Sequence, residues 1–145
     1  MVEMLSFYKY QGLGNDFIIL DGQQNNLSKF NDKEPHDFVR NACNRHFGIG
    51  ADGLIFVSPA EGKGDLTMKI FNSDGTQAEM CGNGIRCLVR YLLDTKQIVV
   101  EQELSIETLA GLVKARINSD KYVTVDMGSP TFEPDEIPTL LSIGV

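Results

Sequence analysis

The sequence predicts an α+β domain in which β-strands outnumber helices. Three observations support this class: short β-rich runs recur along the chain, turn-forming residues such as Gly, Asn and Asp separate them, and only two segments show helical spacing of apolar residues. The 145 residues, of which 42% are hydrophobic and 23% charged, are enough for one domain with its own core.

Strand-like runs dominate the first half of the chain, and we expect strands at residues 5–10, 16–21, 53–58 and 67–71. The third run is continuously apolar, which is typical of a buried strand. The glycine-rich residues 12–15 predict a turn between the first two strands. Asn and Asp shortly before Gly75 predict a tight turn after the fourth strand, at residues 72–75.

Two helices are expected to interrupt these strands. The first runs from residue 35 to about 45 and has Pro in its first turn. The second, at about residues 82–94, is clearer because its apolar residues follow the i, i+3, i+4, i+7, i+8 spacing of one helix face. These residues are Ile85, Leu88, Val89, Leu92 and Leu93.

The second half is again strand-like, with strands expected at residues 98–100, 103–108, 112–117 and 121–127 and hairpin turns at 110–111 and 118–120. Beyond residue 126, Pro130, Pro134 and Pro138 interrupt regular structure. The last six residues are mostly apolar and form no polar tail. We therefore expect a domain over residues 1–130, and at 131–145 the start of a linker in a chain cut near a domain boundary.

Composition and charge exclude several classes of protein. The formal net charge is −7 and the basic residues form no cluster, so nucleic acid is not an expected partner. No apolar run approaches the ~20 residues of a membrane span, and residues 1–10 lack the pattern of a secretory signal. Three cysteines without a secretory context indicate free thiols in a cytoplasmic protein.

Cys81 is the residue best placed for chemistry, because it immediately precedes the second predicted helix and the glycines Gly82 and Gly84. A helix N-terminus exposes unpaired backbone N–H groups and carries about half a positive charge. Such a field favours a thiolate, and the same N–H groups can hold a carboxylate beside the sulfur. The alternative is a buried, inert cysteine that happens to precede a helix.

The other cysteines and the histidines are weaker candidates. Cys43 lies on the apolar side of the first helix and is expected to pack in the core. Cys87 lies opposite the main apolar stripe of the second helix and belongs to the core only if strands surround that helix. Cys43 and His46 have a metal-compatible spacing but provide only two ligands, and His36 is isolated, so no metal site is expected.

Four blocks of sequence, taken together, resemble the diaminopimelate epimerase family. The most specific block is KIFNSDGTQAEMCGNGIRCLVR at residues 69–90. The others are YQGLGNDFIILD at residues 10–21, NRHFGIGADGLIFV at 44–57 and VDMGSPTFEP at 125–134. The blocks occur in the family's order, and the resemblance spans nearly all of the chain.

The resemblance implies a two-domain epimerase that works without pyridoxal phosphate or another cofactor. Each domain of such an enzyme resembles a rolled, mostly antiparallel sheet around a central helix, here at about residues 82–94, with the active site between the domains. The family interconverts LL- and meso-diaminopimelate in lysine and peptidoglycan biosynthesis. One cysteine from each domain flanks the substrate α-carbon, so that a thiolate removes the proton from one face and a thiol returns a proton to the other.

The same resemblance assigns roles to residues of this chain by matching position. Cys81 looks like the family's first catalytic cysteine. Gly82 and Asn83 look like the backbone donors that bind the substrate at the helix N-terminus. Asn15 and Asn72, which turn formation alone would explain, look like side-chain ligands of the substrate.

Two departures from the family pattern bear on function. Many members have Gln at the position of Gly53, and the side-chain contact made by that Gln is not available to this chain. No cysteine follows Cys87, so the partner cysteine is expected in a missing C-terminal domain beyond Val145. The chain is therefore expected to carry one half-site and to have little or no epimerase activity alone.

Two alternatives remain open. One is a related cofactor-independent isomerase of the same fold that acts on proline or a phenazine precursor, although the MCGNG and FNSDG blocks argue against it. The other is a non-catalytic domain that folds and self-associates, for example as a homodimer, through the apolar face that would otherwise meet a partner domain.

Overall fold

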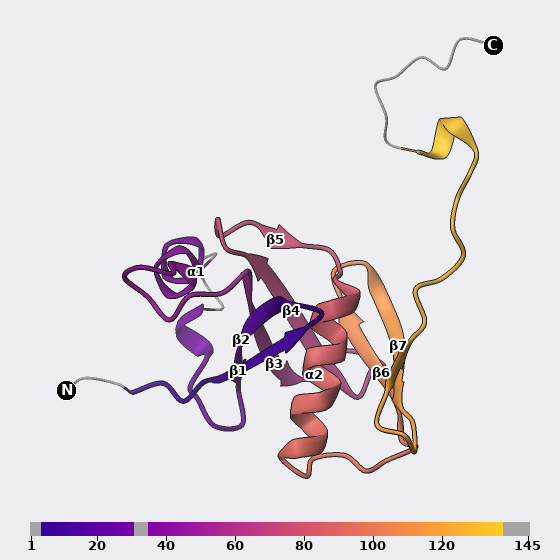
Figure 1. Ribbon diagram of the computed structural model, residues 1–145, viewed down its shortest axis with the longest axis horizontal. Coiled ribbons are helices and arrows are strands. Elements are labelled where there is room, and N and C mark those ends of the chain that lie inside the picture. Colours follow the sequence, from indigo (N-terminus) through magenta and orange to yellow (C-terminus); the bar gives the residue numbers. More distant parts are fainter. Residues whose placement is uncertain (1–3, 31–34, 138–145) are drawn as a thin grey trace.

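The computed structural model describes residues 4–30 and 35–137. Its central feature is a sheet that curls around helix α2, which packs against β1 and β2 on one side and β7 and β8 on the other (Figure 1). The strands are β1 Tyr8–Gly12, β2 Asn15–Asp21, β3 Gly53–Pro59, β4 Leu66–Asn72, β5 Gln77–Ala78, β6 Glu103–Thr108, β7 Gly111–Ile117 and β8 Val123–Val125. The helices are α1 His36–Cys43 and α2 Gly82–Asp94, with short 3-10 turns at Ser28–Phe30 and Pro134–Glu136.

The described strands form one mixed sheet in the order β1-β2-β3-β4-β6-β7-β8, with β5 paired to β4. The pairs β2–β3 and β4–β6 are parallel and all the others are antiparallel. A rolled, mostly antiparallel sheet around a central helix at residues 82–94 is thus confirmed. The two parallel pairs arise where the chain crosses over through α1 and through α2.

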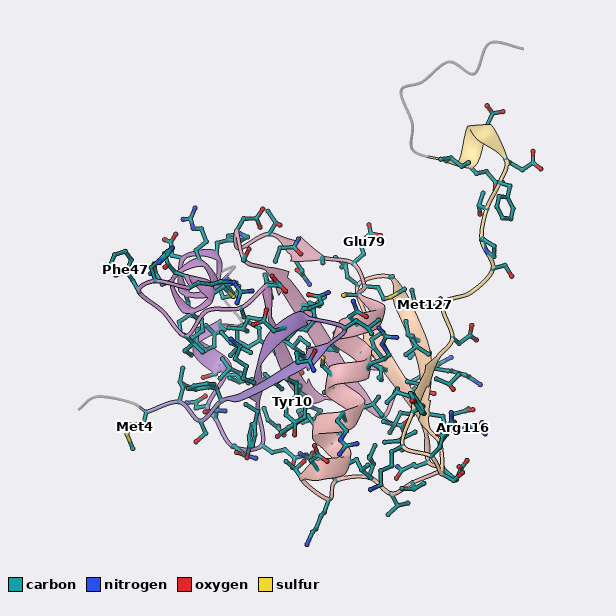
Figure 2. The ribbon with its side chains drawn as sticks, viewed as in Figure 1. Met4, Tyr10, Phe47, Glu79, Arg116 and Met127 are labelled. Atoms are coloured by element: carbon teal, nitrogen blue, oxygen red, sulfur yellow. The ribbon has the colours of Figure 1, made fainter. Side chains whose placement is uncertain are left out.

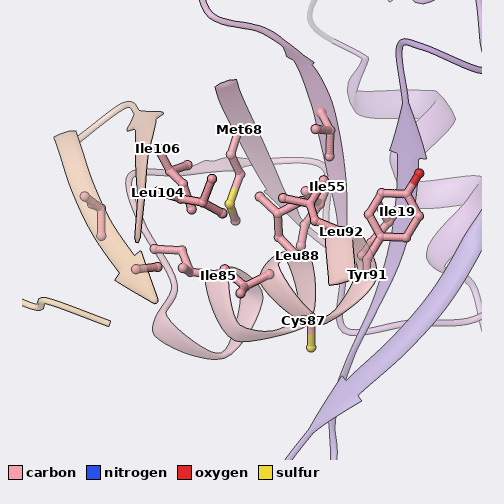
Figure 3. Close-up of a cluster of buried hydrophobic side chains, with 14 of the residues drawn as sticks. Ile19, Ile55, Met68, Ile85, Cys87, Leu88, Tyr91, Leu92, Leu104 and Ile106 are labelled. Atoms are coloured by element: carbon pink, nitrogen blue, oxygen red, sulfur yellow. The ribbon is translucent and has the colours of Figure 1, made fainter. Parts of the chain in front are cut away.

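Apolar side chains of α2 fill the concave side of the sheet. Leu88 and Leu92 point toward Ile55 of β3, whereas Cys87 points to the opposite side of the helix (Figure 3). That opposite side is covered by the β1–β2 hairpin, because a Cβ atom added to Gly12 would lie 3.6 Å from the sulfur of Cys87. Cys87 is therefore a core residue, since strands enclose α2 on both sides.

A second buried cluster lies on the other face of β3, under α1. It combines Val39 and Cys43 of α1 with Leu54 and Phe56 of β3. Because one face of β3 packs on α2 and the other on α1, the strand is apolar at successive positions rather than alternating. The expectation that Cys43 serves packing is confirmed, since its side chain is buried in this cluster.

Three predicted elements need correction. The first strand starts at Tyr8 rather than at residue 5, because pairing with β2 begins there. Residues 98–100 form no strand: Ile98 is buried, but its N–H bonds to Leu92 at the end of α2 rather than to a neighbouring strand. The last strand is shorter than predicted, and the two-residue β5 was not predicted. Apolar composition marks a segment for burial, but strand formation also needs a partner.

The loop before β4 is attached to β6 through the carboxylate of Glu107. That carboxylate accepts hydrogen bonds from the backbone N–H groups of Gly64, Glu61 and Gly62, each at 2.8 Å, and from the Thr67 hydroxyl at 2.7 Å. These donors, with the Gly64 N–H contributing most, lower the pKa of Glu107 from its ordinary 4.5 to about 2.

We expect Glu107→Gln to destabilise the fold at neutral pH, because an amide turns an NH₂ group toward donors that a carboxylate satisfies. The pKa is lower in the folded state, so ionised Glu107 stabilises the fold above about pH 4.5, and this stabilisation is lost as pH falls toward 2. Urea unfolding of both proteins should show a free-energy difference that shrinks over that window. A difference independent of pH between 4.5 and 2 would contradict the expectation.

Candidate active site

The N-terminus of α2 presents Cys81 as predicted. Cys81 is the N-cap residue, with extended backbone angles of φ −145° and ψ 115°, and its sulfur accepts a hydrogen bond from the Gly84 N–H at 3.4 Å. Its carbonyl accepts the N–H of Ile85 at 2.9 Å. The N–H groups of the first turn, including those of Gly82 and Asn83, have no acceptor inside a helix. The thiol of Cys81 thus lies beside donors that favour an anion.

An open depression of about 520 Å³ surrounds this helix terminus. One wall is the first turn of α2, and the other is apolar and comes from β8 and Met127, which follows it (Figure 2). A Cβ atom added to Gly82 would lie 3.2 Å from the Met127 sulfur, so the two walls meet closely. The lining residues are Cys81, Gly82, Asn83, Arg86, Val123, Val125 and Met127.

Arg86 and Met127 are site residues that sequence reasoning did not single out. Arg86 donates a hydrogen bond to the side-chain oxygen of Asn83 and so orients that amide. This contact could have been predicted from the spacing of Asn83 and Arg86, which are three residues apart on a helix. Met127 belongs to the VDMGSPTFEP block, but only the path of the chain after β8 brings it to α2.

Asn15 and Asn72 lie at the same edge of the sheet as the N-terminus of α2, but outside the lining of the depression. Asn15 begins β2 directly after the turn at Leu13 and Gly14, whose φ angles of 56° and 84° are left-handed. The start of this hairpin lies against α2, since a Cβ atom on Gly12 would lie 3.8 Å from the Asn83 carbonyl oxygen. Asn72 ends β4, where its side-chain amide donates to the Thr76 hydroxyl at 3.0 Å.

The sheet register explains why Asn15 and Asn72, although distant in sequence, lie at the same edge of the sheet. Asn72 pairs with Gly53 at the start of β3, and Gly53 pairs with Phe17 near the start of β2. Gly53 itself leaves no room for a side chain: a Cβ atom there would lie 2.6 Å from the Phe71 carbonyl oxygen. A Gln at this position would need a shift of the backbone of β3 or β4.

Burial separates Cys81 from the other two cysteines. The thiol of Cys81 is half-buried, whereas Cys43 and Cys87 are buried. Burial raises the pKa of the Cys43 thiol to about 11, with the negative charge of Asp16 adding to the shift. Burial also raises the pKa of Cys87 to about 11, with nearby Cys81 as the next contribution.

We expect iodoacetamide to alkylate Cys81 at least about 10-fold faster than Cys43 or Cys87 at pH 8, because the thiolate is the reactive form and access is needed. At a pKa of about 11 only about one thiol in a thousand is ionised at that pH. Peptide mapping by mass spectrometry over a time course measures the three rates. Labelling of Cys43 ahead of Cys81 would overturn this order.

Among residues 4–30 and 35–137, no group of three or more His, Cys, Asp or Glu side chains is arranged to hold a metal ion. No helix there is long and apolar enough to cross a membrane.

Comparisons with known proteins agree with this architecture. Residues 7–133 match the family model for diaminopimelate epimerase. The chain is 51% identical over 144 residues to a diaminopimelate epimerase of Prochlorococcus marinus (strain MIT 9313), which covers 99% of this chain and 48% of that protein. It is 50% identical over 141 residues to a diaminopimelate epimerase of Synechocystis sp., which covers 95% of this chain and 48% of that protein.

A solved structure shows the same fold at much lower identity. The hydroxyproline epimerase of Agrobacterium vitis is 19% identical and superposes with a TM-score of 0.63 over 82% of this chain and 40% of that one. The chain spans about half the length of the curated relatives it matches. With a family match over most of its residues, the chain belongs to the diaminopimelate epimerase family.

Proposed function

We propose that this chain is the N-terminal domain of a diaminopimelate epimerase and that Cys81 is one of its two proton-exchanging cysteines. The observation that carries the proposal is the half-buried thiol at the N-cap of α2, beside a depression into which the first helical turn presents its N–H groups. The approximately 50% identity to diaminopimelate epimerases supports the choice of substrate.

The proposed chemistry follows from the charge that builds up on the substrate. The thiolate of Cys81 takes the α-proton, so that the C–H electron pair stays on the substrate and spreads into its α-carboxylate. The N–H groups of Gly82 and Asn83 face that carboxylate and stabilise the added charge, which lowers the barrier to proton removal. A second cysteine then donates its thiol proton to the opposite face of the α-carbon. In the reverse direction the two cysteines exchange roles.

The remaining site residues bind and orient the substrate in this proposal. The side-chain amides of Asn15 and Asn72, at the neighbouring sheet edge, bind polar groups of diaminopimelate. Arg86 keeps the Asn83 amide turned along the helix, and Met127 supplies an apolar wall for the methylene chain. No metal or cofactor has a step in this mechanism.

The proposal also assigns the domain organisation. Residues 1–130 form the N-terminal domain, and residues 131–145 begin the connection to a C-terminal domain that supplies the second cysteine. Relatives of about twice this length support this division. A thiol that must stay reduced suits the cytoplasm, where we place the enzyme and its role in lysine biosynthesis.

The decisive experiment completes the site. The chain is joined to the C-terminal half of the Prochlorococcus marinus relative, and this completed protein is incubated with LL-diaminopimelate in D₂O. We expect meso product carrying deuterium at the α-carbon, and at least about 10²-fold slower turnover by the chain alone, because one base is missing. A folded completed protein without turnover would refute the substrate assignment. Comparable turnover by the chain alone would refute the half-site.

A further inference from the structure

One residue, Asp52, is hydrogen-bonded to the segment that carries Asn15. Its carboxylate oxygen Oδ2 accepts the N–H of Asp16 at 3.0 Å, and its own N–H donates to the Asp16 carbonyl at 3.0 Å and to Asp16 Oδ1 at 3.1 Å. Both polar groups of the Asp16 backbone are therefore held by the same partner. Since Asp16 directly follows Asn15, this pair holds the start of β2.

The same residue is also bonded to the turn that carries Asn72. The carbonyl oxygen of Asp52 accepts the N–H of Ser73, the residue after Asn72, at 3.0 Å. Asp52 therefore contacts the immediate neighbours of both asparagines, which come from strands separated in the sheet by β3. It does not line the depression beside Cys81.

Two cations hold the carboxylates of this cluster together. Arg45 contacts both oxygens of Asp16, at 2.7 and 3.2 Å, and reaches Asp52 Oδ1 at 3.0 Å. Lys9 lies 3.0 Å from Asp16 Oδ2. Without them, two adjacent carboxylates would repel each other. The Arg45 and Asp52 side chains are 54% and 47% exposed, so their ion pair contributes little to global stability and acts mainly on local geometry.

We propose that Asp52 is a positioning residue that fixes Asn15 and Asn72 relative to each other, with Arg45 and Asp16 holding it in place. It acts through the Asp16 and Ser73 backbones and touches no substrate. Its role in substrate binding rests on the proposed function, whereas the coupling between the two segments is a property of the fold alone.

The first test measures that coupling by amide hydrogen exchange in the chain. Asp52→Ala removes the side-chain acceptor and the Arg45 contact but keeps the carbonyl that Ser73 bonds to. We expect exchange at both Asp16 and Ser73 to accelerate by about 10-fold or more, because local opening exposes both amides. Asp37→Asn is the matched control, since it weakens another exposed Asp–Arg pair, with Arg40 on α1, and should change neither amide. Acceleration at Asp16 with Ser73 unchanged would overturn the proposal.

The second test measures epimerisation by the completed protein. Asp52→Asn should raise KM for diaminopimelate by about 10-fold and leave kcat within about 2-fold, because both asparagines bind the substrate before the reaction. A role only in stability would instead reduce the active fraction, which lowers kcat and leaves KM unchanged, and that outcome would overturn the positioning role. If the wild-type completed protein does not epimerise, the proposed function fails together with the substrate role, and hydrogen exchange still decides the coupling.

Discussion

Replacing Cys81 with alanine in the completed protein is expected to lower kcat for epimerisation by about 10²–10⁴-fold, the range for loss of a general base or acid. The reason is that the sulfur of Cys81 has no substitute: it is the half-buried thiol beside the first turn of α2, whereas Cys43 and Cys87 are buried in the core. Deuterium incorporation at the α-carbon and conversion of LL- to meso-diaminopimelate measure the loss.

The control for this experiment separates chemistry from folding. Cys43→Ala removes a buried thiol from the cluster under α1 and should leave kcat per folded molecule unchanged. Cys81→Ala also removes the hydrogen bond from the Gly84 N–H, so circular dichroism must show that α2 is intact. Retention of more than about a tenth of wild-type kcat by Cys81→Ala would show that another group removes the proton.

The second large effect concerns stability. Gly48→Ala is expected to cost about 2–4 kcal/mol of unfolding free energy, because the added methyl group has no space. Its Cβ atom would lie 2.0 Å from the Asn41 carbonyl oxygen, 2.8 Å from that of Ala42 and 2.9 Å from that of Asn44. All three are backbone atoms near the end of α1, so relief requires the loop at residues 44–52 to move, and that loop carries Arg45 and Asp52.

Gly12→Ala is the matched control, since its Cβ atom would meet nothing closer than the Cys87 sulfur at 3.6 Å, an ordinary contact. Urea unfolding followed by circular dichroism gives both free energies. A loss below about 1 kcal/mol for Gly48→Ala, or an equal loss for Gly12→Ala, would show that the loop adapts at little cost.

Elements with strong local patterns were predicted well. The bounds of α2 and β6 agree with the predicted ranges, because the apolar spacing of a helix and a run of β-forming residues between turns are local properties. The strand predicted at residues 98–100 is absent: only Ile98 enters the core, from a turn after α2, and the two residues after it are exposed. Composition cannot tell such an apolar turn from a strand.

The same contrast between local patterns and long-range contacts applies to the candidate site. The placement of Cys81, Gly82 and Asn83 at a helix N-terminus followed from the sequence alone, because a helix start is encoded within a few residues. The proposed role of Asn15 and Asn72 in binding the substrate came from family resemblance, since chemistry alone assigns an asparagine beside glycine to a turn. No pattern in the sequence near either asparagine links it to Asp52.

By itself, the sequence determined the fold class, the central helix, the cysteine at its start and the family to which the chain is similar. Only the tertiary structure decided that Cys87 is enclosed, that Met127 lines the depression, and that Asp52 bonds to the residues next to Asn15 and Asn72. The physical reason is the separation in sequence of the residues that interact. Helix caps and apolar periodicity depend on residues close together in the chain. Strand register and the Arg45 ion pairs join residues that only the folded sheet brings together.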